Sequence, residues 1–217
     1  FTGQDLTGVD PADSSTWSNS NAARNDFLGQ LDGVGDENFE SIAGGTVPPI
    51  ALDFPGSLGS SITANLTNSG IVNSAPDRGR FATSGTNYYQ VITGNDFQID
   101  FSTDVAAFGF YGTDIGDFDG QLSIEFLDEG GNVLFSEDVG IGNASDGNIL
   151  FYGRIDESNP FRSVRFSAIG GNDGFGFDDM IVGDFGQVGR VPLPAAGWLL
   201  LSGVAGIAGL RRFGRKA

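Results

Sequence analysis

The densest group of side chains that can do chemistry is a run of carboxylates at Asp114, Asp117 and Asp119, with glycines beside it at Gly116 and Gly120. Carboxylate oxygens are the ligands that Ca²⁺ prefers, and glycine allows a turn that points them inward. The spacing differs from the D-x-D-x-D-G pattern of an EF-hand loop. The sequence leaves two interpretations open, a calcium loop or an acidic surface loop in an acidic protein.

Other kinds of chemistry are excluded by residue types that the chain lacks. The 217 residues include no histidine and no cysteine. Ser-His-Asp and Cys-His nucleophile systems, thiolate or imidazole zinc sites and disulfide bonds are therefore impossible. The 28 acidic residues leave paired-carboxylate catalysis open, but no pair stands out. We expect a protein that is not an enzyme, with a small glycan-active enzyme as the more distant alternative.

Three tyrosines are candidates for binding a sugar. Tyr88 and Tyr89 are adjacent, and Tyr111 lies three residues before Asp114. Exposed aromatic rings can stack against a sugar ring while nearby acids accept hydrogen bonds from its hydroxyl groups. The sequence predicts a ligand-binding platform at these positions, and packing of the rings at sheet edges is the alternative.

The elements that must position these side chains are short strands. From Asn38 onward, apolar and polar residues alternate in short runs separated by Gly, Asp, Asn and Pro, which is typical of strands with one buried face. Only one helix is expected, over residues 20–31, where apolar residues recur every three or four positions. The expected strands cover residues 61–67, 88–92, 97–101, 105–111, 122–126, 132–136, 148–155, 164–168, 175–177 and 179–183.

This pattern predicts an all-β fold, an antiparallel β-sandwich of jelly-roll type over residues 37–186. Residues 1–36 form a polar segment with the short helix, and the sequence does not show whether they belong to the sandwich or lead into it. The 19 phenylalanines are expected to fill the space between the sheets. Glycines beside phenylalanine, as in Phe108-Gly109-Phe110, are expected to allow a close approach under a ring.

Charge divides the chain into two unlike parts. Residues 1–190 hold 28 acidic and 7 basic residues, a net charge of −21, whereas residues 191–217 hold four basic residues and no acidic one, which gives −17 in total. The excess of acids argues against binding to nucleic acid. Residues 193–210 carry no charge and as a helix would be about 27 Å long. We expect a transmembrane helix there, with a buried core helix as the alternative.

Residues 187–217 combine a short proline motif, the apolar stretch and a basic tail over 211–217. In this order and position the three parts resemble the PEP-CTERM class of bacterial sorting signals, in its VPLPA variant. The resemblance implies an exosortase-type membrane protease as partner, cleavage near the motif and transfer of the mature domain to the exterior; a plain membrane anchor is the alternative. The motif is Val191, Pro192, Leu193, Pro194 and Ala195, and the residues expected to fix the C-terminus on the cytoplasmic side are Arg211, Arg212, Arg215 and Lys216. An exported protein of this kind also needs a secretory signal, which we expect to have been removed before Phe1.

A second resemblance concerns residues 172–179, which read Asn-Asp-Gly-Phe-Gly-Phe-Asp-Asp. The segment is similar to the final strand of jelly-roll modules of the carbohydrate-binding type. That resemblance implies a structural Ca²⁺ held by Glu40, near the first strand, and by Asp178 or Asp179. A cation would offset the cost of a buried carboxylate, and arginine or backbone donors are the alternative partners. Residues 100–184 also resemble the ectodomains common ahead of PEP-CTERM signals, which implies no activity.

Together these features predict an exported bacterial protein of the cell surface or extracellular matrix. It would be held in the membrane by its C-terminal helix and would reach the surface after processing. The expected role is structural or adhesive and linked to exopolysaccharide. A calcium-dependent carbohydrate-binding module acting on extracellular glycan is the first alternative.

Overall fold

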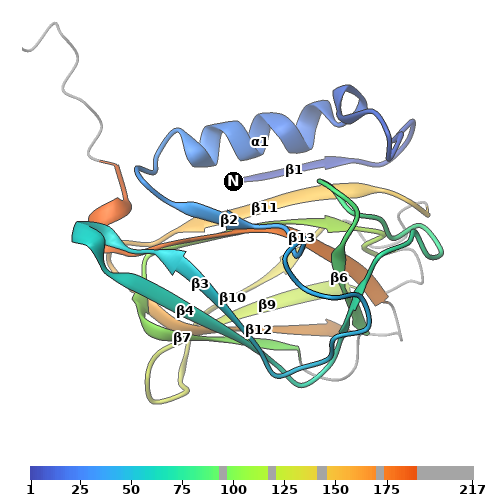
Figure 1. The fold of residues 1–217 in the computed structure, drawn as a ribbon. Helices are drawn as coiled ribbons and strands as arrows, with labels where there is room; N and C mark the ends of the chain where they lie inside the picture. Colours follow the sequence, from blue (N-terminus) through green and yellow to red (C-terminus); the bar gives the residue numbers. More distant parts are fainter. Residues whose placement is uncertain (93–96, 117–120, 141–145, 170–173, 190–217) are drawn as a thin grey trace, which may run out of the picture.

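A computed structural model gives the fold of the chain over residues 1–92, 97–116, 121–140, 146–169 and 174–189. Two antiparallel β-sheets lie face to face in this part of the chain, and one α-helix, α1 (Ser18–Leu28), lies on the outer side of one sheet (Figure 1). The predicted all-β antiparallel sandwich with one short helix is confirmed.

The first sheet has seven strands, in the order β1-β11-β8-β13-β6-β5, with β2 paired to β13 beside that path. They are β1 (Thr2–Asp5), β2 (Gly35–Glu37), β5 (Ile71–Asn73), β6 (Tyr88–Ile92), β8 (Ala107–Thr113), β11 (Ile149–Ile155) and β13 (Gly174–Gly183). Every residue of β8 is buried, as is all of β13 after its first residue. This sheet therefore needs a covering layer on both of its faces.

The second sheet has six strands, in the order β10-β9-β12-β7-β4-β3. They are β3 (Ile50–Pro55), β4 (Ser61–Thr67), β7 (Gln98–Val105), β9 (Gln121–Leu127), β10 (Val133–Val139) and β12 (Phe161–Ile169). Burial alternates along β3 and β4, so one face of this sheet points into the core and the other points outward. Three short 3₁₀ turns are η1 (Ser14–Thr16), η2 (Ser57–Gly59) and η3 (Phe185–Gln187).

The strand predictions are confirmed where the alternation of apolar residues is strong. β4 and β6 have the predicted bounds, whereas the two segments predicted at 175–177 and 179–183 form the single strand β13. The sequence missed β1, β2, β3 and β5. β2 and β5 have three residues each, and β1 reads Thr-Gly-Gln-Asp, so only pairing with a neighbour defines these strands. The helix predicted over 20–31 begins two residues earlier and ends at Leu28.

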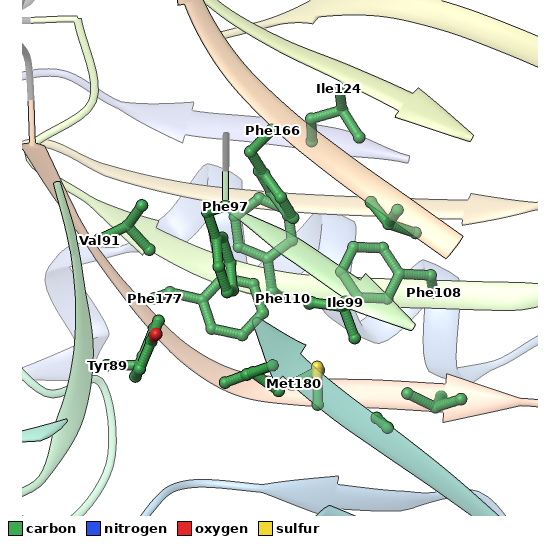
Figure 2. Packing of buried hydrophobic residues seen from close by; sticks show 14 of the residues in the cluster. Tyr89, Val91, Phe97, Ile99, Phe108, Phe110, Ile124, Phe166, Phe177 and Met180 are labelled. Carbon is green, nitrogen blue, oxygen red and sulfur yellow. The ribbon is translucent and has the colours of Figure 1, made fainter. Parts of the chain in front are cut away.

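Aromatic rings fill the space between the sheets. Phe110 of β8 and Phe177 of β13 stack with ring centroids 4.8 Å apart (Figure 2). Both contact Phe166 of the opposite sheet, at 5.5 and 5.9 Å, and Phe97 lies 5.0 Å from Phe166. Such pairs add about 0.5–1.5 kcal/mol each beyond the burial of their area. The expectation that phenylalanine fills this space is confirmed.

A second, smaller core lies between α1 and the outer face of the seven-stranded sheet. Phe27 of α1 is fully buried there, 5.7 Å from the ring of Phe151. Its ring lies over Gly109 and Gly153, where an added Cβ would come within 2.8 and 2.7 Å of ring atoms. Only glycine fits at these two positions. The predicted close approach under a ring is confirmed at Gly109, and the ring belongs to α1.

Asp5 of β1 fixes the start of α1. Its carboxylate accepts hydrogen bonds from the backbone N–H groups of Asn19 (3.1 Å) and Ser20 (2.9 Å) and from Ser20 Oγ (2.8 Å). N–H groups in the first turn of a helix have no partner within the helix, and the positive end of the helix dipole favours a carboxylate. β1 and α1 therefore pack on the sandwich as one unit.

We expect Phe177→Ala to lower the free energy of unfolding by about 3–5 kcal/mol, because the cavity would open between the two sheets. Phe185→Ala is the matched control, since that ring is 63% exposed and its loss should cost less than about 0.5 kcal/mol. Urea denaturation followed by tryptophan fluorescence measures both. If both variants lost the same free energy of unfolding, the result would contradict the conclusion that the aromatic core stabilises the fold.

Candidate functional site

Two segments cover the outer face of the seven-stranded sheet. α1 packs over β1, β11 and β8. Residues 77–87 cross the sheet beside the helix: the N–H of Phe81 donates to Thr113 Oγ1 at 3.3 Å, and the Phe81 ring lies 5.9 Å from Trp17. Several of the acids singled out in the sequence contact this second segment. The hydrogen-bond partners of each acid therefore indicate its role.

Asp178 and Asp179 bind residues 83 and 84 at a bulge in β13. Asp178 Oδ2 accepts hydrogen bonds from the N–H groups of Thr83 (2.7 Å) and Ser84 (3.2 Å). Asp179 accepts from the hydroxyl groups of Thr83 (2.8 Å) and Ser84 (2.7 Å). Adjacent residues of a regular strand point to opposite faces, but the register shift between Asp178 and Ile181 turns both carboxylates toward one loop.

The bulge places two carboxylates side by side in a buried site. Asp178 is 1% exposed and Asp179 is 6% exposed. Burial and then the negative charge of Asp179 raise the pKa of Asp178 well above its usual value. Asp179 also has a left-handed backbone, with φ at 46°, which costs about 1–2 kcal/mol for a residue with a Cβ. The hydrogen bonds to residues 83 and 84 compensate for part of this cost.

Glu40 binds the next part of the same loop. Its Oε1 accepts hydrogen bonds from the N–H groups of Thr86 (2.6 Å) and Asn87 (2.5 Å). These bonds lower the pKa of the exposed Glu40 carboxyl. Gly85 passes so close that an added Cβ would lie 2.4 Å from Glu40 Cδ. Residues 83–87 therefore connect the three acids for which the resemblance implied a shared calcium ion.

The described structure does not gather these three acids into a calcium shell, and calcium binding by Glu40 with Asp178 or Asp179 stays a prediction. Calcium takes about six to eight oxygen ligands, whereas oxygens of Glu40 and Asp178 face backbone N–H groups, which cannot ligate a cation. Within the described ranges, no three acidic side chains gather closely enough to hold a metal ion. The sequence left open the alternative that backbone donors bind a buried carboxylate. The structure shows this arrangement for Asp178.

Asp114 lies directly after β8 and is buried, with a left-handed backbone at φ 64°. Its Oδ1 accepts a hydrogen bond from the N–H of Gly147 at 2.9 Å, and its Oδ2 lies 3.8 Å from Arg80 Nε. Asp114 thus helps to hold residues 77–87 through Arg80. Asp117 and Asp119 lie outside the described residues, so calcium binding by loop 114–119 stays a prediction.

The three tyrosines do not form an exposed platform. Tyr88 and Tyr89 are fully buried and Tyr111 is 4% exposed, so no ring face is free to stack on a sugar. Their hydroxyl groups donate to Ala75 O, Ser69 O and Asn21 Oδ1. Burial raises the pKa of Tyr88 and of Tyr111 to about 12. The platform prediction is wrong. The rings also do not lie on edge strands, because β6 and β8 have neighbours on both sides; Tyr89 packs in the core between the sheets and Tyr111 in the second core under α1.

The predicted sorting signal falls outside the described residues. This applies to the predicted helix over 193–210 and to Val191, Pro192, Leu193, Pro194, Ala195, Arg211, Arg212, Arg215 and Lys216. Among the helices that the structure describes, none has the length and apolar character needed to cross a membrane. Sorting and membrane insertion stay predictions from the sequence.

The outer face of the six-stranded sheet, called the open face below, has no described helix or strand packed across it (Figure 1). Its centre is polar and partly exposed. Arg165 of β12 lies opposite Glu125 of β9, and its Nε donates to Glu125 Oε2 at 2.9 Å. One row away, Asp100 Oδ1 accepts hydrogen bonds from Ser163 Oγ (2.7 Å) and Gln98 Nε2 (2.6 Å). A carboxylate, a guanidinium and an amide therefore lie next to one another on a surface that solvent reaches.

Sequence reasoning singled out neither the open face nor Thr83 and Ser84. A signal for the open face was present, because the residues between the apolar positions of strands 97–101, 122–126 and 164–168 are polar and must point outward. No local pattern reveals that Thr83 binds Asp178, since 95 positions separate them.

Comparison with known proteins gives a likeness of fold. No family model and no curated protein matches the chain. The K2 cleaved adhesin domain of Lys-gingipain has a TM-score of 0.43 at 16% identity, over 69% of this chain and 97% of that chain. The C-terminal family 22 carbohydrate-binding module of Clostridium thermocellum Xyn10B has a TM-score of 0.36 at 15% identity, over 70% and 94%. The MgGH51 α-L-arabinofuranosidase has a TM-score of 0.42 at 16% identity, over 70% of this chain and 26% of that chain.

We expect Asp178 to make the free energy of unfolding fall as the pH rises from about 4. Between the ordinary pKa of 3.8 and the raised value, the folded protein keeps a proton that the unfolded chain has released, so rising pH favours unfolding. Asp179→Asn removes the neighbouring charge and lowers the pKa of Asp178, so the fall should become shallower. Urea denaturation between about pH 4 and about pH 8 measures the slope.

Asp138→Asn is the control for the loss of one negative charge. Asp138 is an exposed acid of β10, far along the chain from the bulge. In Asp138→Asn, the slope of the free energy of unfolding against pH should remain close to that of the unsubstituted protein. An unchanged slope in Asp179→Asn would contradict the coupling of the two buried acids.

Proposed function

We propose that the chain is an exported protein of the bacterial cell surface or extracellular matrix, with a structural or adhesive role linked to exopolysaccharide. The observation that supports this role is the open face. α1 and residues 77–87 cover the outer face of the other sheet, so the open face is the broad sheet surface left for a ligand in the described structure. Polar side chains of the open face hydrogen-bond to one another.

The chemistry of the open face suits hydroxyl groups. A glycan hydroxyl both donates and accepts a hydrogen bond, so it can bridge an acceptor such as Asp100 and a donor such as Arg165. Side chains of Arg165 and Glu125 are 37% and 27% exposed, which leaves part of each for a ligand. The outward positions of β7, β9, β10 and β12 that the structure describes hold no aromatic residue. Each contact is therefore weak, and a polymer that engages many copies suits the site better than a small sugar.

The C-terminal region supports delivery to the surface. The VPLPA motif, the uncharged residues 193–210 and the basic tail have the order of a sorting signal. In this proposal an exosortase-type membrane protease cleaves near residues 191–195 after export, while Arg211 and its basic neighbours remain on the cytoplasmic side. Removal of the tail leaves a domain with a net charge of about −21, which suits a hydrated matrix.

We expect Glu125→Ala/Arg165→Ala to weaken binding to a neutral exopolysaccharide about tenfold, equivalent to about 1.4 kcal/mol, because both ends of the donor-acceptor pair are removed. Arg24→Ala/Asp36→Ala removes another exposed ion pair, which joins α1 to β2, and is the matched control. Retention in affinity electrophoresis through polysaccharide gels measures both. Equal retention of the two variants would contradict binding at the open face, and binding lost with a chelator would favour the calcium-dependent module.

We expect deletion of residues 191–217 to remove the protein from the membrane fraction and to prevent processing. Pro192→Ala/Pro194→Ala changes the motif and leaves the apolar stretch, so the unprocessed protein should accumulate in the membrane. Pro11→Ala, an exposed proline outside the motif, is the control and should be processed normally. Cell fractionation and mass spectrometry of the mature C-terminus give the readout. An unchanged location of the truncated protein would contradict the sorting proposal.

A further inference from the structure

Two large apolar side chains are exposed where the described chain ends. Leu58 of η2 is fully exposed, and Phe185 of η3 is 63% exposed. The two turns contact each other, and the N–H of Ser57 donates to Asp184 Oδ2 at 2.7 Å. Figure 1 shows η2, in cyan after β3, beside η3, in orange at the end of the described chain. Leu58 and Phe185 are called the apolar tip below.

The apolar tip is held in place by a satisfied polar network. Asp184 caps η3 by accepting from the N–H of Gly186 at 2.8 Å, and its own N–H donates to Gln187 Oε1 at 3.0 Å. Gln187 is 3% exposed, and its Nε2 donates to the carbonyls of Gly33 (2.7 Å) and Pro55 (3.0 Å). Buried hydrogen bonds thus fix the backbone of both turns while the apolar side chains point outward. Leu58 also has a left-handed backbone, with φ at 55°.

The length of the following segment limits how far the apolar tip can lie from a membrane. Gly189 is bound to the domain through its N–H, which donates to Gln30 O at 2.5 Å. Four residues lead from Gly189 to Leu193, where the predicted transmembrane helix begins, and can span at most about 14 Å. The headgroup layer of one leaflet is about 5–8 Å thick. A domain tethered this closely has its C-terminal end at the lipid surface.

We infer that the apolar tip docks on the outer lipid surface while residues 193–210 are still in the membrane. The inference rests on the proposed sorting function and adds the orientation of the domain before cleavage. Two side chains bury too little area to hold a free domain on a membrane, and an acidic domain is repelled by anionic lipid. A short tether supplies an effective concentration of about the millimolar range. Cleavage near residues 191–195 removes the tether and releases the tip.

The test uses the full chain in vesicles of phosphatidylcholine, with an environment-sensitive fluorophore on a single introduced cysteine. The protein has no cysteine of its own, so labelling is specific. Leu58→Cys reports on the tip. Val47→Cys is the matched control: Val47 is 57% exposed and precedes β3, whereas Leu58 follows it, so the two lie at opposite ends of that strand. Both positions are exposed, so neither label disturbs the core.

We expect a blue shift and quenching by brominated lipid at position 58 and neither at position 47. Flotation of the vesicles shows separately whether the chain is inserted. An inserted chain with the same emission at both positions would overturn the docking inference and leave the sorting proposal intact. A chain that does not float would overturn both. A shift at position 58 that requires an added membrane-protease fraction would show a protein contact and overturn docking on lipid.

Discussion

The central strands of the seven-stranded sheet are buried on both faces, and the rest of the molecule is arranged around that requirement. In β8, Phe110 points into the core between the sheets, and the next residue, Tyr111, points into the second core under α1. An apolar sheet face left in water would lose the free energy that its burial provides. The helix covers one part of this face and residues 77–87 cover the other. Because no disulfide bond is possible, these layers are held by packing, hydrogen bonds and ion pairs such as Arg24–Asp36 and Arg80–Asp114.

The need to cover this sheet face explains the role of the acids that the sequence analysis singled out. Residues 77–87 cross the sheet as irregular chain, so their N–H groups need partners that a strand or helix would otherwise supply. Asp178 and Glu40 supply them, Asp179 accepts from the hydroxyl groups of Thr83 and Ser84, and Asp114 contacts the same segment through Arg80. Asp5 has the same role at the start of α1. Carboxylates that look like metal ligands in the sequence therefore act as acceptors for backbone that covers a sheet.

The sheet faces that are buried on folding differ from the surfaces proposed for binding. One sheet is covered on both sides, and the other keeps an open polar face on which Asp100, Glu125 and Arg165 are partly available to a ligand. The C-terminal end carries the apolar tip and leads within a few residues into the segment proposed to be a sorting signal. In the proposed function, attachment to the membrane and binding to the matrix would use different surfaces, so cleavage would end the first without altering the second.

Sequence alone determined the features that depend on local order. Alternation along strands such as 61–67 and 88–92 gave the two-sheet architecture, because the side-chain period of a strand is independent of its partners. The lack of histidine and cysteine excluded whole classes of site, and the distribution of charge set residues 191–217 apart from the rest of the chain. Only the tertiary structure decided that Tyr88, Tyr89 and Tyr111 are buried, that β1 and α1 belong to the sandwich and that Asp178 meets Thr83. Those outcomes depend on which face of a strand a second layer covers, and contacts between residues distant in the chain leave no local pattern to read.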